Sequence, residues 1–168
     1  DPRFSKAVIL LCAHDEGGAM GLVINHTLPG IDLSELLEQL EVQDHKTVND
    51  VPVMSGGPVE TARGFILHGN DFKQEDTIKI DEKYSVTGTI DALKAVAGGK
   101  GPDKMLFILG YAGWDAGQLD EELQQNTWLV TEADEDIIFN ATPEEKWHAA
   151  VKKIGFDPGM LSSTAGTA

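Results

Sequence analysis

Residues 105–123 constrain the fold of this chain more than any other segment does. An apolar run opens the segment, spaced glycines follow, and a helical pattern of apolar residues closes it. This order predicts a buried strand over residues 105–109, a glycine-rich corner and then a helix. We expect Asp115 to cap the helix with Gln118 at its third position, and Trp114 to pack on Leu119 as a hydrophobic staple. The motif indicates a well-formed helix start more than a catalytic site.

Apolar segments along the rest of the chain predict a mixture of strands and helices. The expected strands are residues 7–14, 20–25, 51–55, 64–68, 77–80, 84–86 and 105–109, with further short apolar pieces at 128–130 and 137–139. Besides the helix after Asp115, helices are expected after the cap Asp32 with Glu35 at its third position, over residues 89–97, and after the cap Thr142 with Glu145.

The strands and helices do not alternate strictly, which argues against a doubly wound nucleotide-binding fold. We predict an α+β (α/β) protein with a mixed β-sheet, for which a barrel-like form is one alternative, and three to four helices packed against it. A length of 168 residues fits a single domain over 1–168, with a loose tail from about residue 160 to 168.

The charge balance bears on the partners of the protein. Thirteen Lys and Arg residues stand against 28 acidic residues, which gives a net charge of −15. Nucleic-acid binding needs clustered cations, so direct binding to DNA or RNA is not expected. The acidic run at 132–136 lacks the glycine and spacing of a calcium loop, and we interpret it as a solvated acidic face.

Cys12 is the single cysteine of the sequence. One cysteine excludes an intrachain disulfide and a multi-cysteine zinc site, and it fits a reducing compartment, so we expect a cytoplasmic protein. No apolar stretch approaches the length of a membrane span, and no leader precedes the first strand, so no membrane association is expected. The sequence begins at Asp1 without a methionine, and we expect an upstream segment.

Cys12 and His14 are the first candidates for chemistry. If the strand alternates regularly, both lie on the face that also carries Val8 and Leu10, as a redox or general-base role would need. The alternative is a buried cysteine that behaves as a small hydrophobe. Cys12, His14 and His68 also have plausible metal-ligand chemistry, but no fixed ligand spacing joins them, so no metal is expected.

The glycine-rich segments do not match known catalytic or phosphate-binding motifs. Ser55-Gly56-Gly57 follows a strand as a nucleophile elbow would, but Val53 stands where that motif needs glycine, and a tight turn is the better interpretation. Residues 98–101 and the glycines of 110–117 lack the spacing of phosphate-binding loops. No cofactor is therefore expected.

A series of short motifs extends over nearly the whole chain. They are Asp1-Pro2-Arg3-Phe4, Cys12-Ala13-His14, residues 18–25, Gly56-Gly57-Pro58-Val59, residues 63–68, residues 110–123, Asn126 with Trp128, residues 137–139, Trp147, Gly155 and residues 165–168. In this order and spacing the motifs resemble the YqgE/AlgH family of bacterial proteins. The resemblance implies a cytosolic domain with a mixed sheet, the family's label of transcriptional regulator, and no settled catalytic mechanism.

The chain departs from the family pattern at two places. The family often has Cys-Glu-His where this chain has Cys12-Ala13-His14, so a role that needs the middle carboxylate is absent here. The family usually has a short strand before the Asp1-Pro2 pair. Residues 7–13 lack alternating polarity and are predicted to be buried on both faces and paired on both edges. Without the upstream strand, an exposed edge would favour a homodimer.

Two hypotheses for the function follow. The preferred one is a non-enzymatic regulatory or interaction protein that affects transcription through a protein partner. Its candidate ligand or partner surface consists of Ser55, Gly56, Gly57, Arg63, His68, Trp114 and Gln118. The alternative is a redox switch or enzyme that uses Cys12 and His14.

Overall fold

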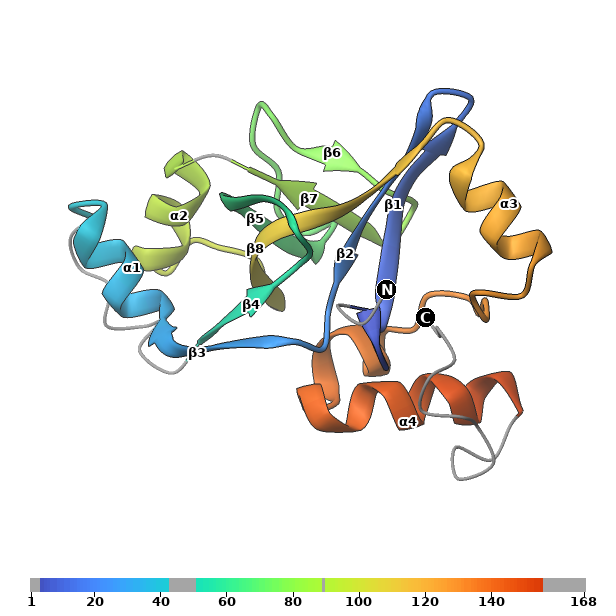
Figure 1. The fold of residues 1–168 in the computed structure, drawn as a ribbon. Coiled ribbons are helices and arrows are strands. Elements are labelled where there is room, and N and C mark those ends of the chain that lie inside the picture. Colours follow the sequence, from blue (N-terminus) through green and yellow to red (C-terminus); the bar gives the residue numbers. More distant parts are fainter. Residues whose placement is uncertain (1–3, 43–50, 89, 156–168) are drawn as a thin grey trace. The chain divides into compact units, whose positions relative to one another are not determined.

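The computed structural model describes residues 4–42, 51–88 and 90–155, and these residues divide between two compact units (Figure 1). Unit 1 takes its residues from 1–26, 56–59 and 111–168, and unit 2 from 27–55 and 60–110. Strand β8 (Met105–Asp115) begins in unit 2 and continues into unit 1. The loose tail predicted at 160–168 lies outside the described residues.

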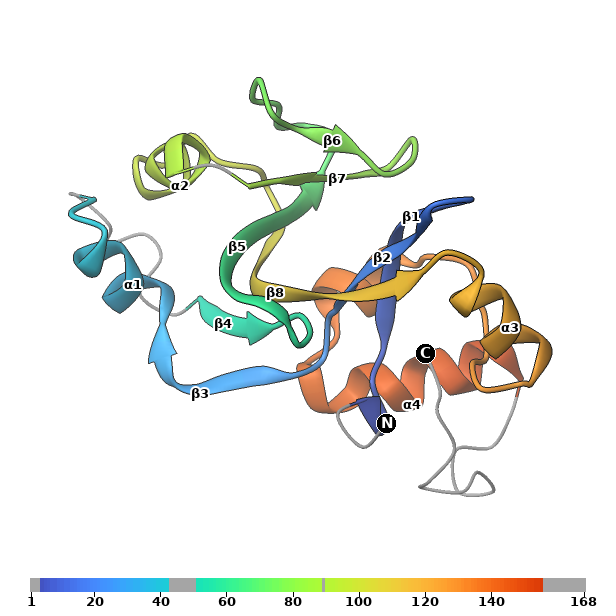
Figure 2. The same cartoon turned by 45° about the horizontal axis from the view of Figure 1, so that its top comes forward.

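Unit 1 is built on a β-hairpin. Strands β1 (Ile9–Asp15) and β2 (Gly18–Val23) pair antiparallel, and β2 also pairs antiparallel with the second half of β8. The helices of this unit are α3 (Gln118–Gln124), a π-helix η3 (Asp136–Asn140) and α4 (Pro143–Ile154). Figures 1 and 2 show α4 beside the open end of the hairpin, away from its tight turn. The hairpin confirms the strand pair predicted from the first two apolar runs.

The prediction that residues 7–13 are buried on both faces and paired on both edges is wrong. β1 stands at the end of the order of paired strands, with β2 as its neighbour. Ala7, Val8 and Leu10 are buried, but Leu11 is 39% exposed. The register shifts between Leu11 and Ala13, so a bulge at Cys12 breaks the alternation on which the shared face of Cys12 and His14 depended.

The glycine-rich corner predicted after residue 109 is also wrong. β8 runs through Gly110 and Gly113 and ends at Asp115, because this half of the strand is paired with β2. Helix α3 then starts at Gln118 with Gly117 as its N-cap, in place of Asp115. One half of the predicted capping box does form, since the Asp115 N–H donates to the Gln118 side-chain oxygen at 3.0 Å.

Helix α4 follows the prediction at its ends and on its buried face. Pro143 occupies the first turn after the N-cap Thr142, and Gly155 ends the helix in a left-handed conformation with φ of 104°. Trp147 and Val151 are buried, as the apolar stripe predicted. The Thr142 side chain makes no capping hydrogen bond, so the predicted capping box is not formed.

Unit 2 contains the parallel pairing that makes the sheet mixed. Its strands are β3 (Thr27–Asp32), β4 (Pro52–Ser55), β5 (Val59–Gly69), β6 (Ile78–Lys79), β7 (Tyr84–Thr87) and the first half of β8. β4 runs parallel to β8, whereas β3–β4, β5–β7 and β6–β7 are antiparallel. The mixed sheet and the four α-helices of the described ranges confirm the predicted fold class.

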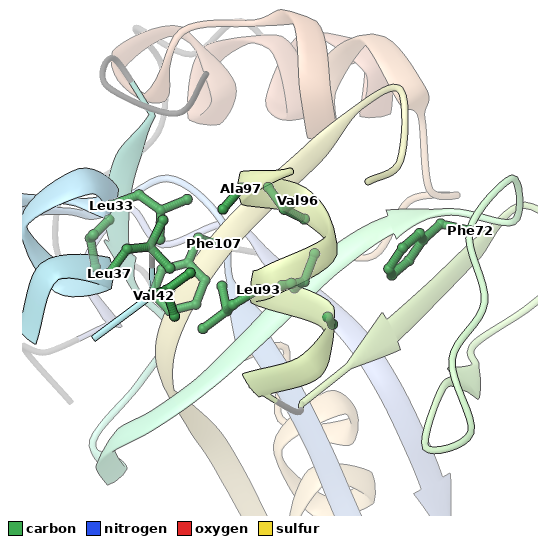
Figure 3. Packing of buried hydrophobic residues seen from close by; sticks show 11 residues of the cluster. Leu33, Leu37, Val42, Phe72, Leu93, Val96, Ala97 and Phe107 are labelled. Atoms are coloured by element: carbon green, nitrogen blue, oxygen red, sulfur yellow. The ribbon is translucent and has the colours of Figure 1, made fainter. Parts of the chain in front are cut away.

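Two helices close the core of unit 2. Helix α1 (Leu33–Gln39) begins as predicted, because the Asp32 carboxylate accepts the Glu35 N–H at 2.8 Å. Helix α2 (Ile90–Ala97) buries its apolar face. Figure 3 shows the side chains of α1 and α2 meeting around Phe107 of β8. The buried cluster is Leu33, Leu37, Val42, Val53, Ile66, Phe72, Ala92, Leu93, Val96, Ala97 and Phe107.

Candidate functional site

A groove of about 210 Å³ opens at the surface of unit 2. It is lined by α1, α2, β5, β8 and the end of β7. The lining residues are mainly apolar: Leu36, Leu40, Ala62, Gly64, Ile66, Thr87, Gly88, Ile90, Leu93, Phe107 and Leu109. The groove therefore lies directly above the core cluster of the unit and continues its apolar surface to the solvent.

The groove exists because the strand beneath it has small side chains. Ala62 and Gly64 of β5 line it, and a side chain at Gly64 would begin 3.0 Å from the Phe107 ring. At the sides, Leu40 at the end of α1 is 41% exposed and Ile90 at the start of α2 is 43% exposed. Two large apolar side chains thus remain in water beside an apolar hollow, a pattern typical of binding surfaces.

Exposed acidic residues outnumber exposed cations on the elements that line this groove. The elements that line it carry the exposed residues Glu35, Glu38, Glu41, Glu60 and Asp91, against the exposed cations Arg63 and Lys94. Arg63 is already engaged, because its Nη1 lies 3.4 Å from Glu60 Oε2 and its guanidinium stacks 5.1 Å from the Phe65 ring centroid. The candidate Arg63 therefore lies close to the groove in a rim of opposite charge.

His68, another predicted candidate, lies fully buried in β5 of the same unit. Its Nδ1 lies 2.6 Å from the Gly69 carbonyl and its Nε2 lies 2.7 Å from the Thr87 hydroxyl, which in turn lies 2.7 Å from the Thr77 hydroxyl. A carbonyl can only accept, so Nδ1 donates its proton to Gly69, and in the neutral ring Nε2 then accepts from the Thr87 hydroxyl. Both ring nitrogens are thus engaged in a network that holds β5 to β7.

Cys12 and His14 have separate partners in unit 1. The Cys12 thiol donates to the Leu10 carbonyl at 3.5 Å, and burial raises its pKa to about 12. His14 Nε2 lies 3.1 Å from Asp120 Oδ1 of α3. A thiol with a raised pKa is a poor nucleophile at neutral pH, because the thiolate is the reactive form.

Trp114 and Gln118 meet on a residue that sequence analysis did not identify. The Glu122 carboxylate accepts the indole N–H of Trp114 at 3.1 Å, that of Trp128 at 2.7 Å, and the Gln118 amide at 2.8 Å. Burial opposes ionisation of Glu122, but hydrogen bonds from Trp128, Gln118 and Trp114 outweigh it and lower the pKa of the carboxyl. The spacing of Gln118 and Glu122, one helical turn apart, was the available signal.

Lys146 is a second residue that sequence analysis missed. Its side chain is 1% exposed, and Nζ donates to the Ile24 and Ile138 carbonyls at 2.8 Å each. Burial lowers its pKa from 10.5 to about 8. The ammonium thereby joins α4 to the end of the hairpin and to η3. A lysine next to the apolar stripe of a helix gives no sequence signal that separates this role from a solvated one.

The Ser55-Gly56-Gly57 segment forms close backbone contacts. Ser55 ends β4 opposite Leu109 in unit 2. In unit 1 the Gly56 carbonyl accepts the Val23 N–H at 3.0 Å, and Gly57 lies so near Tyr111 that a side chain would collide with its backbone. Glycine at 57 is thus required by close packing and by a φ of 148°.

Two further properties of the described residues concern metal binding and membrane spanning. Within these ranges no three His, Cys, Asp or Glu side chains lie close enough together to hold a metal ion. The helices of the same ranges are all too short or too polar to cross a bilayer.

The chain has close relatives in sequence. A UPF0301 protein of Rhizorhabdus wittichii is 48% identical over 168 residues, which cover 100% of this chain and 90% of the relative. A UPF0301 protein of Jannaschia is 48% identical over 170 residues, covering 100% of this chain and 88% of the relative. These names assign no activity.

Solved structures share the fold. The AlgH protein of Pseudomonas aeruginosa matches with a TM-score of 0.81 and 42% identity, over 100% of this chain and 89% of that chain. A protein of Corynebacterium diphtheriae matches with a TM-score of 0.71 and 16% identity, over 90% of this chain and 79% of that chain, which shows a common fold alone. Residues 1–159 also match the sequence profile of the AlgH-like family. With its relatives and its fold in agreement, this chain belongs to the AlgH-like family, as its motifs suggested.

Proposed function

We propose that this protein is a cytoplasmic, non-enzymatic regulator that affects transcription through a protein partner held at the groove of unit 2. The observation that carries the proposal is the pair Leu40 and Ile90, which stay 41% and 43% exposed on either side of an apolar hollow. Keeping two large apolar side chains in water is unfavourable unless a partner covers them.

The state of the reactive groups supports a binding role over a catalytic one. The Cys12 thiol has a pKa raised to about 12 by burial and donates to a backbone carbonyl. His14 pairs with Asp120, and both ring nitrogens of His68 are engaged. A nucleophile needs an adjacent base or a lowered pKa, and Cys12 has neither feature among these contacts.

The charge of the chain supports action through a protein and not through DNA. With a net charge of −15, the protein would be repelled by the phosphate backbone. We expect the purified protein to show no salt-sensitive binding to duplex DNA in an anisotropy titration. Micromolar binding that weakens steeply with added salt would favour direct regulation.

The regulatory role is tested by replacing the chromosomal gene in the host bacterium. Leu40→Glu combined with Ile90→Glu should reproduce the transcript changes of a gene deletion, because charged residues on the groove sides disfavour an apolar contact. Cys12→Ser should leave the transcript levels of the native strain unchanged. RNA sequencing measures both, with protein abundance checked by immunoblot.

The opposite pattern would contradict the proposal. If Cys12→Ser matched the deletion strain while the groove variant matched the native strain, the function would depend on the thiol, as in the redox or enzymatic alternative. If the deletion itself left transcript levels unchanged, the regulatory role would be wrong.

A further inference from the structure

We infer that the groove of unit 2 binds a basic amphipathic segment of a partner protein, which inserts one or two bulky apolar side chains and places Lys or Arg over the rim. This inference rests on the proposed function and specifies the chemistry of the partner. It is argued from the size of the groove, the charges around it and the position of its exposed apolar residues.

The size of the groove favours side-chain anchors. Pockets for small molecules measure roughly 300–1,000 Å³. The groove measures about 210 Å³ and has the exposed Leu40 and Ile90 among its lining residues, so it has room for one or two large side chains and not for a whole cofactor. Protein interfaces commonly place an apolar anchor in such a hollow, surrounded by polar contacts.

The charge of the rim selects the flanking residues of the partner. α1 and the residue after its C-cap carry Glu35, Glu38 and Glu41, and the segment 27–42 contains no Lys or Arg. Across the groove, α2 adds Asp91 in its first turn. A ligand segment with acidic flanks would meet like charges on two sides, whereas Lys or Arg at the same places would be attracted.

The basic residues near the groove offset only part of this acidic charge. Arg63 lies 3.4 Å from Glu60, so its charge is offset locally. Lys94 is exposed one helical turn beyond Ile90 in α2, where it offsets Asp91, so the excess of acidic charge lies on the segment of α1. Apolar hollow and acidic rim thus occur on the same elements, and an amphipathic basic segment complements both.

The experiment uses synthetic peptides as probes for the full chain. A fluorescein-labelled amphipathic peptide of leucine and lysine is compared with a leucine–glutamate peptide and with a glutamine–lysine peptide of the same charge. Binding is followed by fluorescence anisotropy at about 0.15 M salt, where long-range attraction is screened beyond about 8 Å. The leucine–lysine peptide should bind more tightly than either comparison.

Two variants separate groove binding from general adsorption. Leu40→Glu with Ile90→Glu should weaken binding at least about tenfold. If the cationic peptide only adsorbed to the acidic surface, this variant would bind it more tightly, because the two substitutions add negative charge. Ala62→Trp fills the groove from an exposed position and should weaken binding similarly. Thermal unfolding checks that each variant is folded. If the double variant does not fold, Ala62→Trp alone tests binding at the groove.

A matched pair of triple variants tests the acidic rim. Neutralising Glu35, Glu41 and Asp91 to their amides should weaken binding of the leucine–lysine peptide about three- to tenfold. Neutralising the exposed acids Glu121, Glu132 and Glu144 of unit 1 makes the same change in net charge and should alter binding less than about twofold.

The remaining outcomes contradict either the groove as the binding surface or the basic chemistry of the partner. Equal effects of the two triple variants, or tighter binding by the Leu40→Glu, Ile90→Glu variant, would show general adsorption and overturn it. If the leucine–glutamate peptide bound as tightly and Ala62→Trp blocked it, the basic chemistry would be wrong although the groove still docks a partner. A groove variant that reproduces the deletion strain while no peptide binds would leave the proposed function standing and overturn this partner chemistry.

Discussion

Unit 1 supplies its buried polar side chains with internal partners, whereas unit 2 also keeps an apolar groove open to solvent. In unit 1, Cys12, His14, Glu122 and Lys146 each have intramolecular partners that satisfy their polar atoms. In unit 2, the groove leaves Leu40 and Ile90 exposed beside an apolar hollow. The sequence candidates Cys12 and His14, like Glu122 and Lys146, thus have partners within the fold, and the surface that we propose for a partner is made by residues of ordinary chemistry.

The reason for this difference is physical. A buried polar group is costly without a hydrogen bond, so a fold that buries a lysine or an indole must supply its partner internally. An apolar groove arises because Ala62 has only a methyl group and Gly64 has no side chain, and because two helices end beside them. The following predictions test the two halves of this comparison, from the largest expected effect to the smallest.

Cys12 should react very slowly with a neutral alkylating agent in the folded protein. Its pKa is raised to about 12 by burial, so almost no thiolate is present at neutral pH. We expect alkylation at least about 10²-fold slower than in the urea-unfolded chain. The rate is measured by mass spectrometry after timed exposure to iodoacetamide. A ratio within about tenfold would mean that unit 1 presents a usable thiol.

Lys146→Met should lower the free energy of unfolding by about 2 kcal/mol at pH 7, because the buried Ile24 and Ile138 carbonyls lose their donor. Methionine keeps most of the side-chain volume, so the change reports the polar contacts. Urea denaturation followed by circular dichroism measures it.

The difference in the free energy of unfolding between the native protein and Lys146→Met should increase at high pH. Burial lowers the pKa of Lys146 from 10.5 to about 8, so between these pH values the unfolded chain binds more protons and the native protein gains stability as pH rises. The difference should grow by about 2 kcal/mol up to pH 10. A difference that stays constant from pH 7 to 10 would contradict the burial of the ammonium.

Glu122→Ala should destabilise unit 1 by about 1–2 kcal/mol, since the indoles of Trp114 and Trp128 lose their shared acceptor. Glu122→Gln keeps an oxygen acceptor and should cost less. The pKa of Glu122 is lowered from 4.5, so its stabilising contribution is complete above that pH and is lost as the pH falls through the lower, folded-state value. Indole N–H resonances that do not move on acidification, or equal costs for the two variants, would argue against this contact.

Asp32→Ala and Thr142→Ala should differ, although the sequence predicts a capping role for both. Asp32 accepts the Glu35 N–H, and its loss should cost about 1 kcal/mol. The Thr142 side chain makes no capping bond, so its replacement should cost less than about 0.5 kcal/mol. Thermal unfolding compares them, and equal costs would contradict the capping assignment.

Sequence analysis predicted the elements better than their boundaries. Caps and glycine stops are local, so α1 and the end of α4 were predictable from Asp32 and Gly155. The extension of β8 through Gly113 was not, because it depends on pairing with β2. The bulge at Cys12 was not predictable for the same reason: the register of a pair is a property of two strands.

The groove was not predictable from the sequence. Arg63 was one of the candidates and its role stays a prediction, whereas the groove beside it depends on which small residues of β5 come to lie between α1 and α2. Glu122 was missed because the approach of the Trp114 and Trp128 indoles depends on how β8 and the segment after α3 fold around it, and Lys146 was missed because its acceptors are backbone carbonyls. A candidate chosen by residue type alone cannot be separated from a residue that stabilises the fold.

Site-specific photocrosslinking in living cells tests the central claim most directly. A photoreactive phenylalanine analogue is placed at Leu40 or Ile90 of the groove, and at Leu11 of unit 1, whose exposure of 39% matches theirs. We predict that positions 40 and 90 crosslink to the same protein through a Lys- or Arg-rich segment identified by mass spectrometry, and that position 11 does not. Crosslinks to that protein from position 11, with none from 40 or 90, would contradict the assignment of the binding surface to unit 2.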